Sequence, residues 1–184
     1  MKLIVWLGNP GSQYTNTRHN IWATMLERFV SHENLWKLKY SAKFLAEVLI
    51  LSAPGGNQRA EGVIFAFPQT FMNLSGNAVE SLARFYQIKP TDILVLHDEI
   101  ELPLGKIVIK NWWGAAGHNG LRSIISKLGS PDFQRLRIGV GKSEVIGVAD
   151  FVLQKFKPNE MQVLNEKEKE IFGQISAFLA QNFD

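Results

Sequence analysis

Short apolar runs along the chain alternate with segments whose apolar residues recur at a helical spacing. The runs are typical of buried strands, and a spacing near 3.6 residues is typical of amphipathic helices. Strands are predicted at 2–8, 44–51, 62–67, 92–96, 106–110 and 135–140, and helices at 20–35, 75–86, 120–128 and 158–183. This alternation predicts one α/β domain over residues 1–184, a three-layer sandwich whose helices flank a twisted, mixed and mostly parallel sheet.

Polar residues follow several of these predicted strands. Asn9 and His19 come after the first strand, Asn73 after the third and Asp98 after the fourth, and a further loop follows Lys110. Ligands of open α/β sheets bind at the carboxyl ends of the strands. The pattern therefore predicts a functional site built from these loops.

Composition excludes several classes of protein. The chain has no cysteine, which excludes disulfides, thiolate catalysis and Cys-ligated zinc. No apolar run approaches the roughly 20 residues that span a bilayer, and the N-terminal run lacks the pattern of a signal peptide. We expect a cytoplasmic protein without membrane contact. We also expect a monomer, because no unusually apolar exposed stripe is evident.

Familiar nucleotide and metal motifs are incomplete in this chain. The sequence GVGKS at 139–143 lacks the first glycine of a P-loop, which would fall at Leu136. The four histidines show no HExxH spacing, and no G-x-S-x-G elbow occurs. We therefore expect neither a metal nor a cofactor. The remaining candidate chemistry is general acid–base catalysis by a histidine.

A base, a carboxylate and two amides are candidates for that chemistry. His19 could act as the base, Asp98 could orient it, and Asn73 and Asn119 could hold a carbonyl or an oxyanion. Each of these residues alone also has a structural interpretation, at a helix start, a strand end or a turn. Together they form the set that general acid–base catalysis requires.

Positive charge is concentrated in one part of the chain. Residues 101–145 hold seven Lys and Arg against three acids. This balance is compatible with a solvated basic face or with a phosphate-binding patch. Phe71, which lies between turn residues, and Tyr14 could add flat apolar surfaces for stacking.

Five motifs give the chain a resemblance to a known family. They are LGNPGSQYTNTRHN (7–20), PQTFMNLSG (68–76), HDEIELPLGK (97–106), GHNGLRSI (117–124) and RLRIGVG (135–141). In order and spacing they are similar to those of bacterial peptidyl-tRNA hydrolases, and the resemblance covers nearly the whole chain. It implies an enzyme that hydrolyses the ester between a peptide and the terminal ribose of tRNA, and so recycles tRNA from aborted translation.

The resemblance also implies roles for the polar residues. His19 matches the base that deprotonates the attacking water, and Asp98 matches the carboxylate that supports it. Asn9 matches the residue that recognises the blocked α-amino end of the substrate. Asn73 and Asn119 match amides that bind peptide backbone and steady the water or the developing oxyanion.

Further positions match residues that contact tRNA in the family. Tyr14 and Phe71 match aromatic positions around the tRNA end and the substrate. Lys110 and Arg137 match the two cations that clamp a terminal phosphate of tRNA. The basic segment is thereby expected to bind RNA through its backbone, a contact that weakens as salt rises.

Four tryptophans stand where the family usually has glycine: Trp6, Trp22, Trp112 and Trp113. Large rings at tight positions predict overpacking, which typically destabilises by about 1–3 kcal/mol. The pair at 112–113 falls in a loop that is normally glycine-rich. Compensating changes nearby, an aromatic platform for the tRNA end, or a codon that the source organism reads as glycine would each explain the pattern.

Two other classes of protein remain open on the sequence alone. Proteins of this fold can act as RNA-binding factors without hydrolysis, and the complete set of polar site residues argues for the enzyme instead. A generic nucleotide-binding α/β protein is the third interpretation, and the incomplete glycine motifs argue against it.

Overall fold

Seven strands form one sheet in the order β2-β3-β4-β1-β5-β7-β6 in the computed structural model, which describes residues 1–32, 38–52, 62–111 and 114–181. The four central strands β4, β1, β5 and β7 are parallel, and the outer strands pair antiparallel. The strand bounds are Lys2–Trp6 (β1), Lys39–Ser41 (β2), Ala46–Ser52 (β3), Gly62–Pro68 (β4), Ile93–Glu99 (β5), Ile107–Asn111 (β6) and Gln134–Gly139 (β7).

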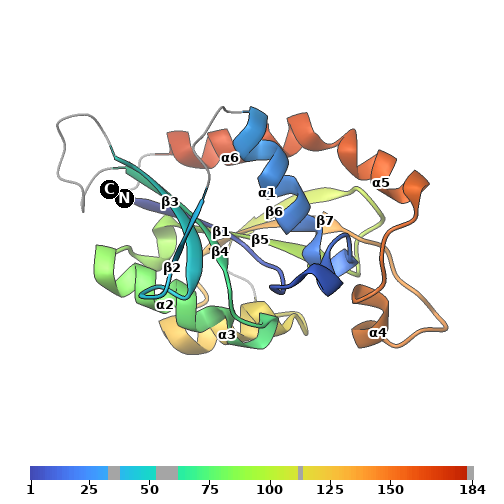
Figure 1. Ribbon diagram of the computed structural model, residues 1–184, viewed down its shortest axis with the longest axis horizontal. Coiled ribbons are helices and arrows are strands. Elements are labelled where there is room, and N and C mark those ends of the chain that lie inside the picture. The colour runs from blue at the N-terminus through green and yellow to red at the C-terminus, as the bar shows by residue number, and fades with distance from the viewer. Residues whose placement is uncertain (33–37, 53–61, 112–113, 182–184) are drawn as a thin grey trace.

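Helices cover both faces of the sheet, so the predicted three-layer α/β sandwich is confirmed (Figure 1). One face carries α1 (Ile21–His32), α5 (Pro158–Asn165) and α6 (Glu168–Ala180), and the other carries α2 (Ser75–Tyr86) and α3 (Asn119–Leu128). The short α4 (Val148–Val152) lies beside the carboxyl ends of the central strands. No helix within the described part of the chain is both long and apolar enough to cross a membrane.

Alternation of side chains along β1 divides the core into two layers. Ile4 and Trp6 belong to the layer that packs against α1 and α6, and Leu3 and Val5 belong to the layer under α2 and α3. All four are fully buried. Successive side chains of a strand point to opposite faces, so a central strand covered on both sides needs a continuous apolar run.

Several predicted elements differ from the observed ones. The single helix predicted at 158–183 is two helices, because Lys167 bonds to the carbonyl of Leu164 in a tight turn that separates α5 from α6. The strand predicted from Phe44 begins at Ala46, after a turn. β2 and α4 were not predicted, because three exposed or half-exposed residues and a five-residue helix carry little periodicity.

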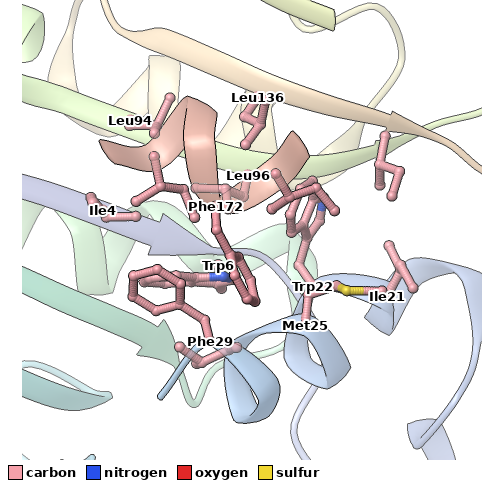
Figure 2. Close-up of a cluster of buried hydrophobic side chains, with 14 of the residues drawn as sticks. Ile4, Trp6, Ile21, Trp22, Met25, Phe29, Leu94, Leu96, Leu136 and Phe172 are labelled. Atoms are coloured by element: carbon pink, nitrogen blue, oxygen red, sulfur yellow. The ribbon is translucent and has the colours of Figure 1, made fainter. Parts of the chain in front are cut away.

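Trp6 and Trp22 are completely buried in the core between the sheet and α1 (Figure 2). The ring of Trp6 lies 5.5 Å from that of Phe65 and 6.0 Å from that of Phe29. Nε1 of Trp22 has no hydrogen-bond partner among the described residues, an arrangement that is usually unfavourable. The predictions made for Trp112 and Trp113 lie outside the described residues.

Candidate active site

The loops that follow the central strands meet at one edge of the sheet. Because β4, β1, β5 and β7 are parallel, their carboxyl ends bring together Asn73, Asn9 with His19, and Asp98. β6 runs antiparallel to β7, so Lys110 lies opposite Arg135, near the start of β7. The prediction that the loop after Lys110 begins at the same edge is therefore wrong.

His19 and Asp98 form the central contact of this edge. Nδ1 of His19 lies 2.8 Å from Oδ1 of Asp98, and the two side chains are 12% and 3% exposed. His19 belongs to a 3-10 turn, Arg18–Asn20, that precedes α1, and Asp98 lies near the end of β5. With Nδ1 bound to the carboxylate, Nε2 is the ring nitrogen available to accept a proton from another molecule.

The turn that carries His19 is held from the opposite side by Arg18. The Arg18 guanidinium donates to the carbonyl of Val140 at 3.1 Å and to the carboxylate of Glu160. It also lies over the rings of Phe151 and Phe156, at 4.3 and 4.8 Å from their centroids. These contacts fix the neighbouring His19 backbone against β7, α4 and α5.

The pKa values of the pair reflect burial and mutual attraction. Burial alone would lower the pKa of His19, because it disfavours the charged ring. The attraction of the Asp98 carboxylate is stronger than this effect, so the pKa of His19 is raised above its ordinary value. Burial would raise the pKa of Asp98, yet His19 and the hydrogen bonds from His118 and His19 hold that pKa well below its usual range. Asp98 is therefore an acceptor near neutral pH, and the raised pKa of His19 means that its ring keeps a proton to higher pH than an ordinary histidine does.

Asn9 is held in one orientation by three hydrogen bonds. Its backbone N–H donates to Oδ1 of Asn20, and Nδ2 of Asn20 donates to its backbone carbonyl, both at 2.8 Å. Its side-chain Oδ1 accepts from the backbone N–H of Met72 at 2.8 Å. Since Oδ1 is occupied, Nδ2 is the group that Asn9 can present to a ligand, and it can only donate.

Two cavities share His19 and Asn119, together with Ala149 and Val152 of α4. The larger, about 480 Å³, is lined by the three amide side chains and by apolar residues: Asn9, Asn73, Asn119, Phe71, Met72 and Leu153. The smaller, about 330 Å³, extends past Asp98, Glu99 and His118 toward Ile100 and Val148. The base therefore lies between an amide-lined cavity and a largely apolar one.

Gly120 allows two of these amides to approach each other. A Cβ at this position would lie 2.6 Å from Sδ of Met72 and 2.9 Å from a methyl carbon of Leu7. Without a side chain there, the first turn of α3 packs directly on the 3-10 turn Met72–Leu74. This brings Asn119, the first residue of α3, to the cavity that Asn73 also lines.

The three remaining predicted site residues, Tyr14, Lys110 and Arg137, do not line either of the two cavities at His19. Tyr14 is half-buried in the 3-10 turn Ser12–Tyr14. Arg137 donates to Oε2 of Glu99 at 2.9 and 3.2 Å. Register places Arg137 opposite Val108 and Lys110 opposite Arg135, so the three cations lie on one face of the β6–β7 ladder.

His118 is the site residue that the sequence analysis missed. Its Nε2 lies 3.1 Å from the same Asp98 oxygen that contacts His19, and its ring is 4.9 Å from the His19 ring. The available signal was its position directly before a predicted helix, after the expected loop of small residues. His19, Asp98 and His118 each offer one ligand atom, all within 4.8 Å of one another, a spacing that a metal ion could use.

Comparisons with known proteins identify the family to which this chain belongs. A family model described as peptidyl-tRNA hydrolase matches residues 3–184. The peptidyl-tRNA hydrolase of Dichelobacter nodosus is 45% identical over 167 residues, covering 90% of this chain and 85% of that protein. The peptidyl-tRNA hydrolase of Lactiplantibacillus plantarum is 37% identical over 182 residues, which cover 99% of this chain and 95% of that protein.

Solved structures show the same likeness. A crystal structure of peptidyl-tRNA hydrolase in complex with N-propanol matches with a TM-score of 0.85 and 36% identity, covering 97% of this chain and 88% of that one. The enzyme from Acinetobacter baumannii matches with a TM-score of 0.81 and 36% identity, covering 97% and 92%. Sequence and structure thus agree over nearly the full length, and the chain belongs to the peptidyl-tRNA hydrolase family.

Proposed function

We propose that this chain hydrolyses the ester of peptidyl-tRNA with His19 as a general base that activates water. The observation that carries the proposal is the 2.8 Å contact between Nδ1 of His19 and buried Asp98, at the junction of two cavities. The carboxylate orients the ring and stabilises its protonated form, as in a catalytic triad without the serine.

The reaction follows from that orientation. Nε2 of His19 removes a proton from a water molecule while the water oxygen attacks the ester carbonyl carbon. The carbon–oxygen bond to the ribose breaks as the tetrahedral intermediate collapses, and the proton held by His19 passes to the leaving ribose oxygen. The products are tRNA with a free hydroxyl and a peptide with a free carboxylic acid, which releases its remaining proton to solvent.

Asn9 would select substrates whose α-amino group is acylated. A peptide carries a carbonyl oxygen next to that nitrogen, and the Nδ2 group of Asn9 can donate a hydrogen bond to it. An unblocked aminoacyl ester carries an ammonium group there, which can only donate. Because Oδ1 of Asn9 is occupied by the Met72 amide, the ammonium group would meet another donor and be disfavoured.

Asn73 and Asn119 would hold the reacting carbonyl. Both side chains are exposed on the wall of the amide-lined cavity. Oδ1 of Asn119 accepts from Arg122 at 3.0 Å, so its Nδ2 is left to donate to substrate. A donor fixed toward developing negative charge lowers the barrier more than one that must reorient.

The tRNA would extend from this site toward β6 and β7, the strands that carry Lys110 and Arg137. Phe71, which is 55% exposed beside Asn73, offers a ring on which a base of the tRNA end can stack. Lys110 and Arg137 would contact a backbone phosphate farther along the tRNA, and Tyr14 would lie near the tRNA end and the substrate. Phosphate contacts of this kind position the substrate without reading its sequence. The expectations of a monomer that works in the cytoplasm remain predictions.

The test is release of N-acetyl-aminoacyl groups from tRNA, with unblocked aminoacyl-tRNA in parallel. We expect hydrolysis of the blocked substrate, little of the unblocked one, and loss of activity in His19→Ala. The exposed Arg84→Ala change on α2 is the matched control and should leave the rate unchanged. A folded wild-type protein that binds tRNA without hydrolysing the blocked substrate would contradict the proposal and favour an RNA-binding factor.

A further inference from the structure

Both ring nitrogens of His118 are engaged, and they contact different partners. His118 precedes α3 as its N-cap residue, where Nδ1 accepts from the backbone N–H of Gly120 at 3.1 Å and of Leu121 at 3.4 Å. On the other side of the ring, Nε2 lies 3.1 Å from Oδ1 of Asp98. The His118 side chain is 8% exposed.

These contacts determine which nitrogen of His118 carries the proton. A backbone N–H can only donate, so Nδ1 must be the unprotonated nitrogen. The ring proton then resides on Nε2 and is donated to Asp98. A second proton on Nδ1 would point at two N–H groups of the first turn of α3, where the helix dipole also disfavours positive charge.

We propose that His118 is a positioning residue, held by α3 as the Nε2–H tautomer, and that it shares Oδ1 of Asp98 with His19. A carboxylate oxygen that accepts from two donors attracts the proton of each one less strongly than if it served one alone. His118 therefore limits how firmly Asp98 holds the proton of His19. The assignment of His19 as the base rests on the proposed function; the tautomer and the sharing of Asp98 do not.

The same arrangement opposes a metal ion in the His19–Asp98–His118 cluster. A neutral imidazole has one unprotonated nitrogen, and in His118 that nitrogen already accepts from the amides of α3. Coordination through Nε2 would move the proton to Nδ1, against those N–H groups. A cation would therefore have to disrupt the N-cap of α3 before it could use all three ligands.

Other titratable groups lie on the elements that surround the pair. On β5, buried His97 donates through Nδ1 to the Asp98 carbonyl, and burial together with His118 lowers the pKa of His97 to about 3. Glu99 pairs with Arg137 of β7. In the turn that carries His19, Arg18 pairs with Glu160 of α5. The one titratable side chain of α4, Asp150, is exposed.

Two substitutions separate the roles of the two nitrogens of His118. In His118→Asn, the amide oxygen can replace Nδ1 as helix cap but the side chain is too short to reach Asp98. In His118→Gln, the longer amide can donate to Asp98 in place of Nε2, but the cap is lost. The matched pair thus removes either the contact with Asp98 or the contact with α3.

The quantity to measure is the pH at which His19 is half protonated. NMR signals of its imidazole ring, recorded as a function of pH without substrate, give this midpoint for the wild type and each variant. We expect His118→Asn to raise this midpoint by about 0.5–1 pH unit, because Asp98 then serves His19 alone. His118→Gln should keep the wild-type midpoint and unfold at a lower temperature. An unchanged midpoint in His118→Asn, or equal shifts in both variants, would overturn the proposal.

Two further readouts complete the test. Long-range proton–nitrogen NMR spectra of the wild type should place the His118 proton on Nε2. A proton on Nδ1 would contradict the proposed tautomer. Equilibrium dialysis against Zn²⁺ should show no uptake that depends on His118, and stoichiometric uptake lost in His118→Asn would favour a metal site instead. None of these readouts needs turnover, so their failure is distinguishable from an absence of peptidyl-tRNA hydrolysis.

Discussion

The Arg18 guanidinium donates to both carboxylate oxygens of Glu160, at 2.8 and 3.0 Å, across 142 positions of the chain. This contact joins the turn that carries the predicted base to the first turn of α5. Arg18 is only 5% exposed, and its guanidinium contacts this partner, the Val140 carbonyl and two aromatic rings in place of water. A helix near the C-terminus, α5, therefore helps to hold the turn that carries His19.

Replacing Glu160 by Gln should destabilise the protein and reduce activity. A nearly buried guanidinium would lose its charged partner, which we expect to lower the free energy of unfolding by about 1–3 kcal/mol. Urea denaturation measures this change. The matched control is Glu170→Gln, which breaks an exposed pair with Lys167 and should change stability by less than about 0.5 kcal/mol. Equal losses in the two variants would show that the Arg18 contact has no special importance.

The activity should rise with pH through a midpoint above the ordinary histidine value. Asp98 raises the pKa of His19, and only the unprotonated ring can accept a proton from water. The limb of kcat/KM on the acidic side should therefore lie above pH 6.5. In Asp98→Asn the midpoint should fall and kcat should drop by about 10²–10⁴-fold. An unchanged pH profile in that variant would contradict the assignment of His19 as the base.

The same pair should affect stability with the opposite dependence on pH. Since the folded pKa of His19 is above its unfolded value, its contribution is complete below the unfolded pKa and is lost as pH rises through the folded one. Comparing the thermal unfolding of wild type and His19→Gln from pH 5 to 9 measures this. The difference between them should shrink toward high pH; a constant difference would indicate that the pair does not titrate.

Substrate selection should depend on the single donor of Asn9. Asn9→Asp retains an oxygen to accept from the Met72 amide but replaces the Nδ2 donor with a second acceptor. We expect a lower kcat/KM for N-acetyl-aminoacyl-tRNA and a smaller preference over unblocked aminoacyl-tRNA, by about tenfold or more. The ratio of the two rates is the readout, because it cancels losses common to both substrates. A preserved ratio would exclude Asn9 from selection.

Removing Lys110 should weaken tRNA binding without altering the chemical step. We expect Lys110→Ala to raise KM, to leave kcat nearly unchanged and to reduce the slope of log affinity against log salt by about one. Lys127→Ala, an exposed lysine near the end of α3, is the control. Arg137 is less suitable for this test, because its removal would leave the 6%-exposed Glu99 side chain without its ion-pair partner. The same dependence of affinity on salt in the wild type, Lys110→Ala and Lys127→Ala would argue against a phosphate contact at Lys110.

The buried tryptophans offer a direct test of core strain. Trp22→Phe keeps most of the apolar volume and removes the N–H that has no partner among the described residues, so stability should be unchanged or rise by about 1 kcal/mol. Trp22→Gly should destabilise by about 3–5 kcal/mol, because it empties a fully packed site. A glycine variant as stable as the wild type would instead support overpacking by tryptophan at this position. Chemical denaturation distinguishes these outcomes.

Local patterns predicted most of the elements but not their connections. β1 and β5 were recognised because strands buried on both faces need continuous apolar runs. The division between α5 and α6 was missed, since neither proline nor glycine marks the turn at Glu166 and Lys167. The direction of β6 was also unpredictable, because it depends on pairing with β7 rather than on its own residues.

Periodicity and motifs a few residues long were enough to predict the α/β class, the family and the residue types available for catalysis. Which side chains share a partner could not be predicted in this way, because it depends on how the chain folds. His19 and His118 are 99 positions apart, and a single oxygen of Asp98 contacts both. Such contacts depend on strand order, on the close approach of α3 at Gly120 and on which imidazole nitrogen meets a backbone amide. These are properties of the folded chain that no local pattern encodes.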